Sequence, residues 1–108
     1  MYYLTNDHDI INMIDLRYMH NISVMPVSEA VVNRMSWVPM IYGNKGDSEW
    51  PDVADQMQAI FGRPIQEVDP STQIFLDVGD RLYIPIRQYD PDARDKTVIR
   101  FIEVRIDV

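Results

Sequence analysis

The chain has 108 residues, of which 46% are hydrophobic, and its 10 basic and 17 acidic residues give a net charge of −7. This length and apolar content predict a single folded domain over residues 1–108. The negative charge argues against non-specific DNA binding, which depends on neutralising phosphates, and the lack of cysteine excludes disulfides, thiolate zinc sites and cysteine nucleophiles.

No segment resembles a signal peptide, and no apolar run approaches the roughly 18 residues that a membrane span needs. The cysteine-free composition fits a reducing compartment. We therefore expect a cytoplasmic protein with no membrane contact.

The first predicted element is a short strand, Tyr2–Asn6, that ends in a polar loop. Tyrosine and leucine favour a half-buried pleated surface, whereas Asn6 and Asp7 readily end strands. The loop also carries His8, and polar loops at strand ends often hold ligand sites.

A second strand is predicted over Asn21–Met25, ended by Pro26, and a short helix follows from an N-cap at Ser28 to about Met35. Residues 36–50 are less regular. Their glycine-containing segment Gly43–Asp47 is a loop, which in some proteins presents N–H groups to an anion and more often is a plain turn.

The clearest helix begins near Pro51 and Asp52 and is capped by Gly62. Its apolar residues lie at helical spacing and predict a core-facing stripe: Val53, Ala54, Met57, Ile60 and Phe61.

The last third of the chain predicts strands. Ile65–Val68 is short and extended, and Gln73–Val78 and Arg81–Ile86 flank Gly79-Asp80 as a hairpin. Pro85 suggests an edge or a bulge near the end of its strand. Val98–Ile106 has apolar residues on both faces, which predicts an inner strand.

The predicted fold class is α+β, with a mixed, mainly antiparallel sheet of about five strands and two main helices packed on it. If both helices cover one face, the other face needs a cover, which a homodimer would supply.

Few residue patterns point to chemistry. His8 lies between Asp7 and Asp9, but adjacent residues do not point at one centre, and no histidine pair at helical spacing exists, so we expect no metal and no cofactor. Phosphate-binding glycine motifs and a Gly-x-Ser-x-Gly elbow are also absent. On residues alone the chain is a soluble acidic α+β domain.

The opening run Tyr3-Leu4-Thr5-Asn6, followed by Ile11-Asn12-Met13-Ile14, resembles the start of the small viral ring-nuclease family of anti-CRISPR proteins. Further similar segments follow in the same order along the chain: Val27–Ala30, Ala54–Ile65, Val78–Tyr83 and Arg100–Val104. The resemblance implies a mixed sheet with flanking helices and a homodimer. It also implies binding of a cyclic oligoadenylate across the dimer interface, with metal-independent cleavage in active members.

The chain departs from the family at the catalytic position. Where the family has Ile-Gly-His before the central helix, this chain has Tyr42-Gly43-Asn44, followed by an apparent insertion through Trp50. Asparagine hydrogen-bonds a phosphate but does not exchange a proton near neutral pH. The family's ligand-holding Gln-x-x-x-Arg-Leu-Pro-Glu-Gly segment is replaced here by Arg87–Asp92.

The resemblance therefore favours an anti-defence protein of a virus that sequesters a cyclic oligonucleotide or related nucleotide signal in the host cell cytoplasm, without cleaving it. Lys45 and Arg87 are expected to meet phosphate, and Asn6 and Gln88 to contact sugar or base edges. The remaining candidate ligand-binding residues lie in the two loops: His8, Asp9 and Asn44.

Two alternatives remain open from the sequence. In one, cleavage survives and His8 has taken over proton transfer as the catalytic residue of a ring nuclease. In the other, the chain is an inhibitor of a host defence protein, and the acids at positions 47, 49, 52 and 55 mimic nucleic acid to a basic partner.

Overall fold

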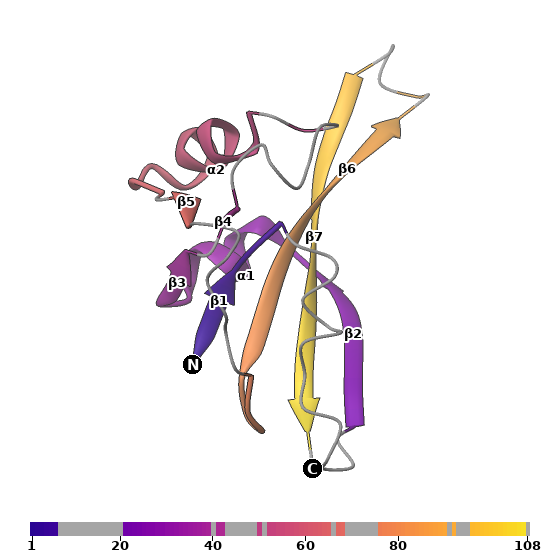
Figure 1. The fold of residues 1–108 in the computed structure, drawn as a ribbon. Helices are drawn as coiled ribbons and strands as arrows, with labels where there is room; N and C mark the ends of the chain where they lie inside the picture. The colour runs from indigo at the N-terminus through magenta and orange to yellow at the C-terminus, as the bar shows by residue number, and fades with distance from the viewer. Residues whose placement is uncertain are drawn as a thin grey trace.

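The computed structural model describes residues 1–6, 21–39, 41–42, 50, 52–65, 67–68, 76–90, 92 and 96–107. The strands in this part of the chain are β1 Tyr2–Leu4, β2 Asn21–Val27, β3 Trp37–Pro39, β4 Ile41–Tyr42, β5 Glu67–Val68, β6 Arg81–Asp90 and β7 Lys96–Asp107. The main sheet has five strands in the order β2-β7-β6-β1-β3, while β4 and β5 form a two-stranded sheet (Figure 1).

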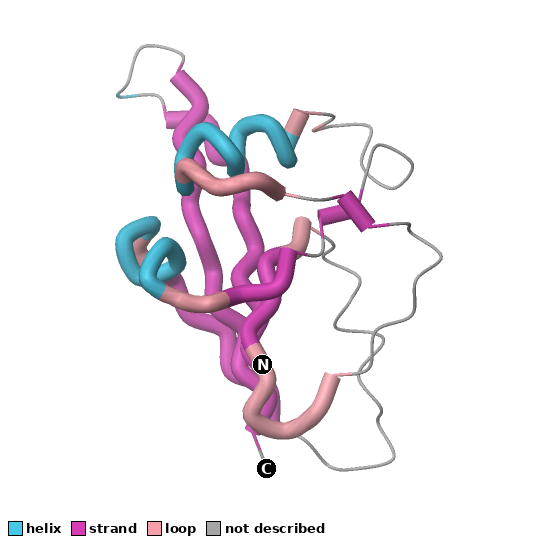
Figure 2. Tube along the Cα trace, turned by 90° about the vertical axis from the view of Figure 1, so that its left-hand side faces the viewer, coloured by secondary structure: helices cyan, strands magenta, loops and turns pink. Residues whose placement is uncertain are grey.

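The described helices, α1 Glu29–Arg34 and α2 Val53–Phe61, lie on the same face of the main sheet (Figure 2). β1 pairs in parallel with β3 and β6, whereas β7 pairs antiparallel with β6 and β2 over longer stretches. The predicted fold class, an α+β domain with a mixed five-stranded sheet, is confirmed.

Helix α1 begins as the sequence predicts. The Ser28 hydroxyl accepts a hydrogen bond from the Val31 N–H at 3.3 Å, and the side chain of Val32 is fully buried. The far end is held by Arg63, which donates to the carbonyls of Asn33 and Met35 and lies 4.3 Å from the Trp37 ring centroid. This arginine supplies partners for carbonyls that the helix end leaves unpaired.

Helix α2 confirms the predicted stripe and cap. Its buried residues are Val53, Ala54, Met57 and Phe61. Gly62 adopts the left-handed conformation with φ of 66° and donates its N–H to the Gln58 carbonyl at 2.8 Å.

The predicted hairpin around Gly79-Asp80 is wrong. Residues 76–80 form no strand, and β6 pairs with β1 and β7 instead. The Gly79 N–H donates to the Ile106 carbonyl at 2.8 Å, and the Ile106 N–H donates to Asp80. The Gly-Asp signal marks a real turn, but the turn binds to the distant strand β7, which local sequence does not reveal.

Two prolines lie inside strands. β2 continues through Pro26 to Val27, so the predicted end at Met25 is wrong, and β6 continues through Pro85 to Asp90 without a bulge. In β7, Ile106 bonds toward β6, so alternation turns the odd residues of β7 toward β2. The Pro26 nitrogen therefore faces outward from the edge strand, where no donor is needed.

The sheet buries a cluster on each face. The helix side contains Leu4, Tyr83 and Phe101 together with the buried residues of both helices. The opposite face has a cluster of Tyr3, Leu76, Leu82, Ile84, Val104 and Ile106. Because this second cluster is already buried in the single chain, the middle of the face does not need the homodimer cover that the sequence suggested.

Candidate functional site

The candidate site lies at the carboxyl end of β1. β1 is flanked by two strands that run parallel to it, with Leu4 opposite Pro39 of β3 and Tyr83 of β6. Where parallel strands end together, side chains from neighbouring strands converge, and ligands of α/β sheets bind outside such ends. We define the carboxyl-end site as Thr5, Asn6, Trp50 and Arg87.

Thr5 and Asn6 follow the last residue of β1 and are buried although both are polar, with exposures of 0% and 5%. The Thr5 N–H donates to the Tyr83 carbonyl at 3.0 Å, which is the last described contact of β1 with β6. The next donor in this ladder would belong to Pro85, which has none. The proline therefore removes one hydrogen bond from the ladder directly after Thr5.

Arg87 is the charged member of the site. It lies on β6 beyond Pro85 and is exposed, and its guanidinium carbon is 5.4 Å from the ring centroid of Trp50. A guanidinium over an indole face is attracted by the ring and restricted in its motion. Trp50 thus supports a cation at the end of the sheet.

A tryptophan near a nucleotide site can stack on a base, and a tryptophan in a folded domain can also cover the core. The structure places it in the helix-side cluster with 6% exposure. It therefore belongs to the core. Its contact with Arg87 was missed by sequence reasoning, and no local pattern signals it because the two residues are 37 positions apart (87 − 50).

Gln88 is exposed like Arg87 but points to the other face of the sheet, because successive strand residues alternate. Arg87 pairs with Ile99 and Gln88 with Val98 across β7. The structure thus brings Arg87 together with Trp50 and separates Gln88 from them. The other candidates, His8, Asp9, Asn44 and Lys45, lie outside the described residues, so their roles stay predictions.

A buried polar group lies on the helix side of the sheet, in register with Leu4, the last residue of β1. Glu103 is 2% exposed and pairs with Arg105, and Glu103 is opposite Tyr83 on β6. Burial raises the pKa of the Tyr83 hydroxyl, and the nearby Glu103 carboxylate raises it further. Pairing with Glu103 raises the pKa of Arg105. In the sequence, Glu103 could have been recognised as an acidic residue inside a predicted apolar inner strand.

Two further chemical classes were checked on the described part of the chain. There, no three His, Asp or Glu side chains come close enough to hold a metal ion. Neither described helix has the length and apolar character needed to cross a membrane.

The fold defines an α+β protein with a five-stranded mixed sheet covered by helices on one face. Among solved structures, the chain is similar to B116 of Sulfolobus turreted icosahedral virus (STIV), with 16% identity and a TM-score of 0.53, over 96% of this chain and 97% of that chain. This likeness shows a shared fold with a viral protein. No family model and no curated protein matches the sequence.

Proposed function

We propose that the chain is a viral anti-defence protein that binds a cyclic oligonucleotide, or a related nucleotide signal, at the carboxyl-end site and sequesters it. The observations that carry the proposal are the buried position of Asn6 directly after β1 and the contact of Arg87, farther along the neighbouring strand β6, with Trp50. The fold likeness to viral B116 over nearly the whole chain supports the viral part.

The chemistry of these side chains suits a nucleotide. A guanidinium donates two parallel hydrogen bonds to a phosphate, and an asparagine both donates to and accepts from sugar or base edges. The net charge of −7 means that a phosphate must be attracted locally, so a fixed arginine matters more here than in a basic protein.

Binding is proposed in preference to cleavage because Asn44 stands where the resembling family has its histidine. A ring nuclease uses the substrate's own 2′-hydroxyl, and loss of acid–base help costs roughly 10²–10⁴ in rate while binding survives. The proposal includes a homodimer and action in the host cell cytoplasm, both of which come from the resemblance.

The test is to incubate the protein with a panel of cyclic oligonucleotides that includes cyclic tetra-adenylate, remove free ligand, denature the protein and identify released nucleotides by mass spectrometry. Intact ligand recovered from the protein would support sequestration. Linear product that accumulates with time would show that cleavage survives. If neither ligand nor product is recovered, the proposal is overturned. That result would favour an inhibitor that binds a host protein.

Arg100 offers a matched control. It is an exposed arginine on β7 opposite Ile86, on the other face of the sheet from Arg87. Arg87→Gln and Arg100→Gln make the same change in charge, but only the first alters the carboxyl-end site. Equal losses of recovered ligand would mean that overall charge, rather than this site, governs binding.

A further inference from the structure

The outer strand β2 is exposed and uncharged. Its seven residues, Asn21–Val27, include no acidic or basic side chain, although the chain as a whole has a charge of −7. Ile22, Val24 and Met25 are 38%, 58% and 36% exposed. Edge strands usually carry charged residues that prevent pairing with another strand. Here Pro26 is the single protective residue of that kind within β2.

The absence of charge restricts what can cover this edge. A basic or acidic partner would find no opposite charge along β2 to recognise. A second copy of the same chain meets an uncharged strand with its own uncharged strand. The nearest charges belong to β7, where Asp107 accepts a hydrogen bond from the Ser23 hydroxyl at 3.4 Å and Arg105 is opposite Ser23, so an acid and a base of each copy flank the contact. Apolar side chains on the strand then gain by leaving water.

Among the described strands, β2 is at the edge of the sheet and pairs on one side only, with β7. β7 uses its odd residues to bond β2, and Ser23 is opposite Arg105 in that register. By alternation, the N–H and C=O groups of Ile22 and Val24 point outward from the sheet. A strand with this pattern is complementary to an antiparallel copy of itself.

We propose that two copies of the chain associate by antiparallel pairing of their β2 strands, with Ser23 on the two-fold axis. In this register Ile22 of one copy is opposite Val24 of the other, and the outward N–H and C=O groups of both residues are paired. The two sheets become one continuous sheet, and the four apolar side chains cluster on the face opposite the helices.

Pro26 favours the register centred on Ser23 over the neighbouring register centred on Val24. Centring the pair on Val24 would place Pro26 opposite Ile22 of the second copy, where the proline ring replaces the N–H that the Ile22 carbonyl needs. Centring it on Ser23 moves Pro26 beyond the described start of the partner strand at Asn21. The proline thus limits the length of the contact without preventing it.

The β2 pairing does not depend on nucleotide binding and is separate from any dimer that holds a ligand at the carboxyl end of β1. A two-fold axis through Ser23 leaves the carboxyl end of β1 in each copy open. A ligand that spans two copies at that end would need a separate contact. Failure of nucleotide binding and failure of this pairing are therefore measured independently, by ligand recovery and by oligomeric state.

The chain lacks cysteine, so single cysteines report the contact directly. Residues opposite each other in a non-hydrogen-bonded antiparallel pair have Cα atoms about 4.5 Å apart, which suits a disulfide. Ser23→Cys should therefore form a covalent dimer on mild oxidation. Met25→Cys is the matched control on the same face, because its two copies would lie about 13 Å apart and cannot bridge.

Val24→Lys tests the contact without a disulfide. Val24 is 58% exposed, so the variant should keep the parent's circular dichroism and melting temperature. Analytical ultracentrifugation should show a dimer for the parent and a monomer for Val24→Lys.

A monomeric parent would overturn the proposal, and binding of a host protein that Val24→Lys abolishes would then assign the edge to that partner. A dimer that survives Val24→Lys, or equal crosslinking of Ser23→Cys and Met25→Cys, would place the interface elsewhere or in another register.

Discussion

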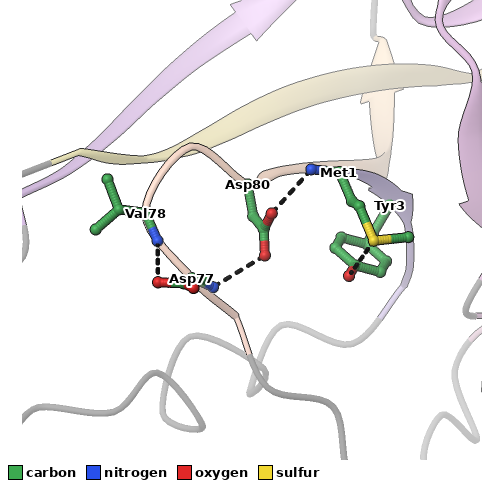
Figure 3. A network of polar contacts seen from close by, with 5 residues as sticks. All are labelled: Met1, Tyr3, Asp77, Val78 and Asp80. Atoms are coloured by element: carbon green, nitrogen blue, oxygen red, sulfur yellow. Dashed lines mark hydrogen bonds and ion pairs between the residues drawn. The ribbon is translucent and has the colours of Figure 1, made fainter.

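The amino end of β1 is tied to its surroundings by polar groups that pair with one another, whereas its carboxyl end stops beside a proline and presents polar side chains to the strand end. At the amino end, the Asp80 carboxylate accepts from the Met1 amino group and from the Asp77 N–H, both at 2.9 Å (Figure 3). The Tyr3 hydroxyl lies 3.5 Å from the Met1 sulfur in the same cluster.

At the carboxyl end, Thr5 makes the last described hydrogen bond between β1 and β6, and β6 continues past it to Arg87 while still paired with β7. One short strand thus has one end held by mutually paired polar groups and another end to which we assign the proposed ligand site. Polar groups that satisfy each other lock a turn, whereas at the other end an exposed guanidinium lies over an aromatic ring.

The largest expected effect is at the amino end. Asp80→Ala should lower the free energy of unfolding by about 1–3 kcal/mol, because a nearly buried acceptor of two hydrogen bonds is lost. Urea unfolding measures the loss, and nucleotide binding should be unchanged. Asp77→Ala, an exposed acid in the same turn, is the control; an equal loss there would mean that contact with Met1 is not what stabilises the turn.

The second prediction concerns the end of the ladder. Pro85→Ala should cost about 0.4–1 kcal/mol, because the unfolded chain regains freedom that proline removes. The new N–H should pair with the Thr5 carbonyl and exchange slowly with deuterium, which would extend β1 pairing by one residue. Rapid exchange at position 85 would show that something other than the missing donor ends the strand.

The third prediction separates stability from binding at the carboxyl end. Arg87→Gln should change the free energy of unfolding by no more than about 1 kcal/mol, the size of an exposed cation–π contact. Loss of charge-assisted bonds worth about 1.5–3 kcal/mol should weaken nucleotide binding roughly ten- to a hundredfold. Calorimetry with the ligand recovered from the parent measures this, with Arg100→Gln as the reference that should bind normally.

The smallest effect appears only at alkaline pH. Burial, and then the Asp80 charge, raises the pKa of the Tyr3 hydroxyl above its usual value of 10.0. Above about pH 10 the unfolded chain loses this proton while the folded chain keeps it, so stability falls as pH rises. Tyr3→Phe should reduce that decline in urea unfolding between about pH 9 and pH 11. A slope identical to the parent's would remove Tyr3 as a contributor.

Much of the fold follows from local sequence. Ser28 and Gly62 mark helix boundaries because their preferences act within one turn, and the apolar stripe of α2 needs only its own periodicity to predict its buried face. The inner position of β7 also follows from its own residues, since apolar side chains alternate on both faces.

The tertiary structure decided what depends on distant partners. Gly79-Asp80 looks like a hairpin locally, but β7 and the Met1 amino group provide its contacts, so β6 pairs elsewhere. The sequence shows that Pro85 has no backbone N–H, but only the strand order shows that its nitrogen faces β1. Trp50 precedes α2 and Arg87 lies on β6, so the two side chains meet only in the folded chain. Sequence alone determined the composition, the helix ends and the alternation of strand faces, because these depend on near neighbours. Strand partners and the carboxyl-end site required the folded chain, because each depends on residues that only packing brings within reach.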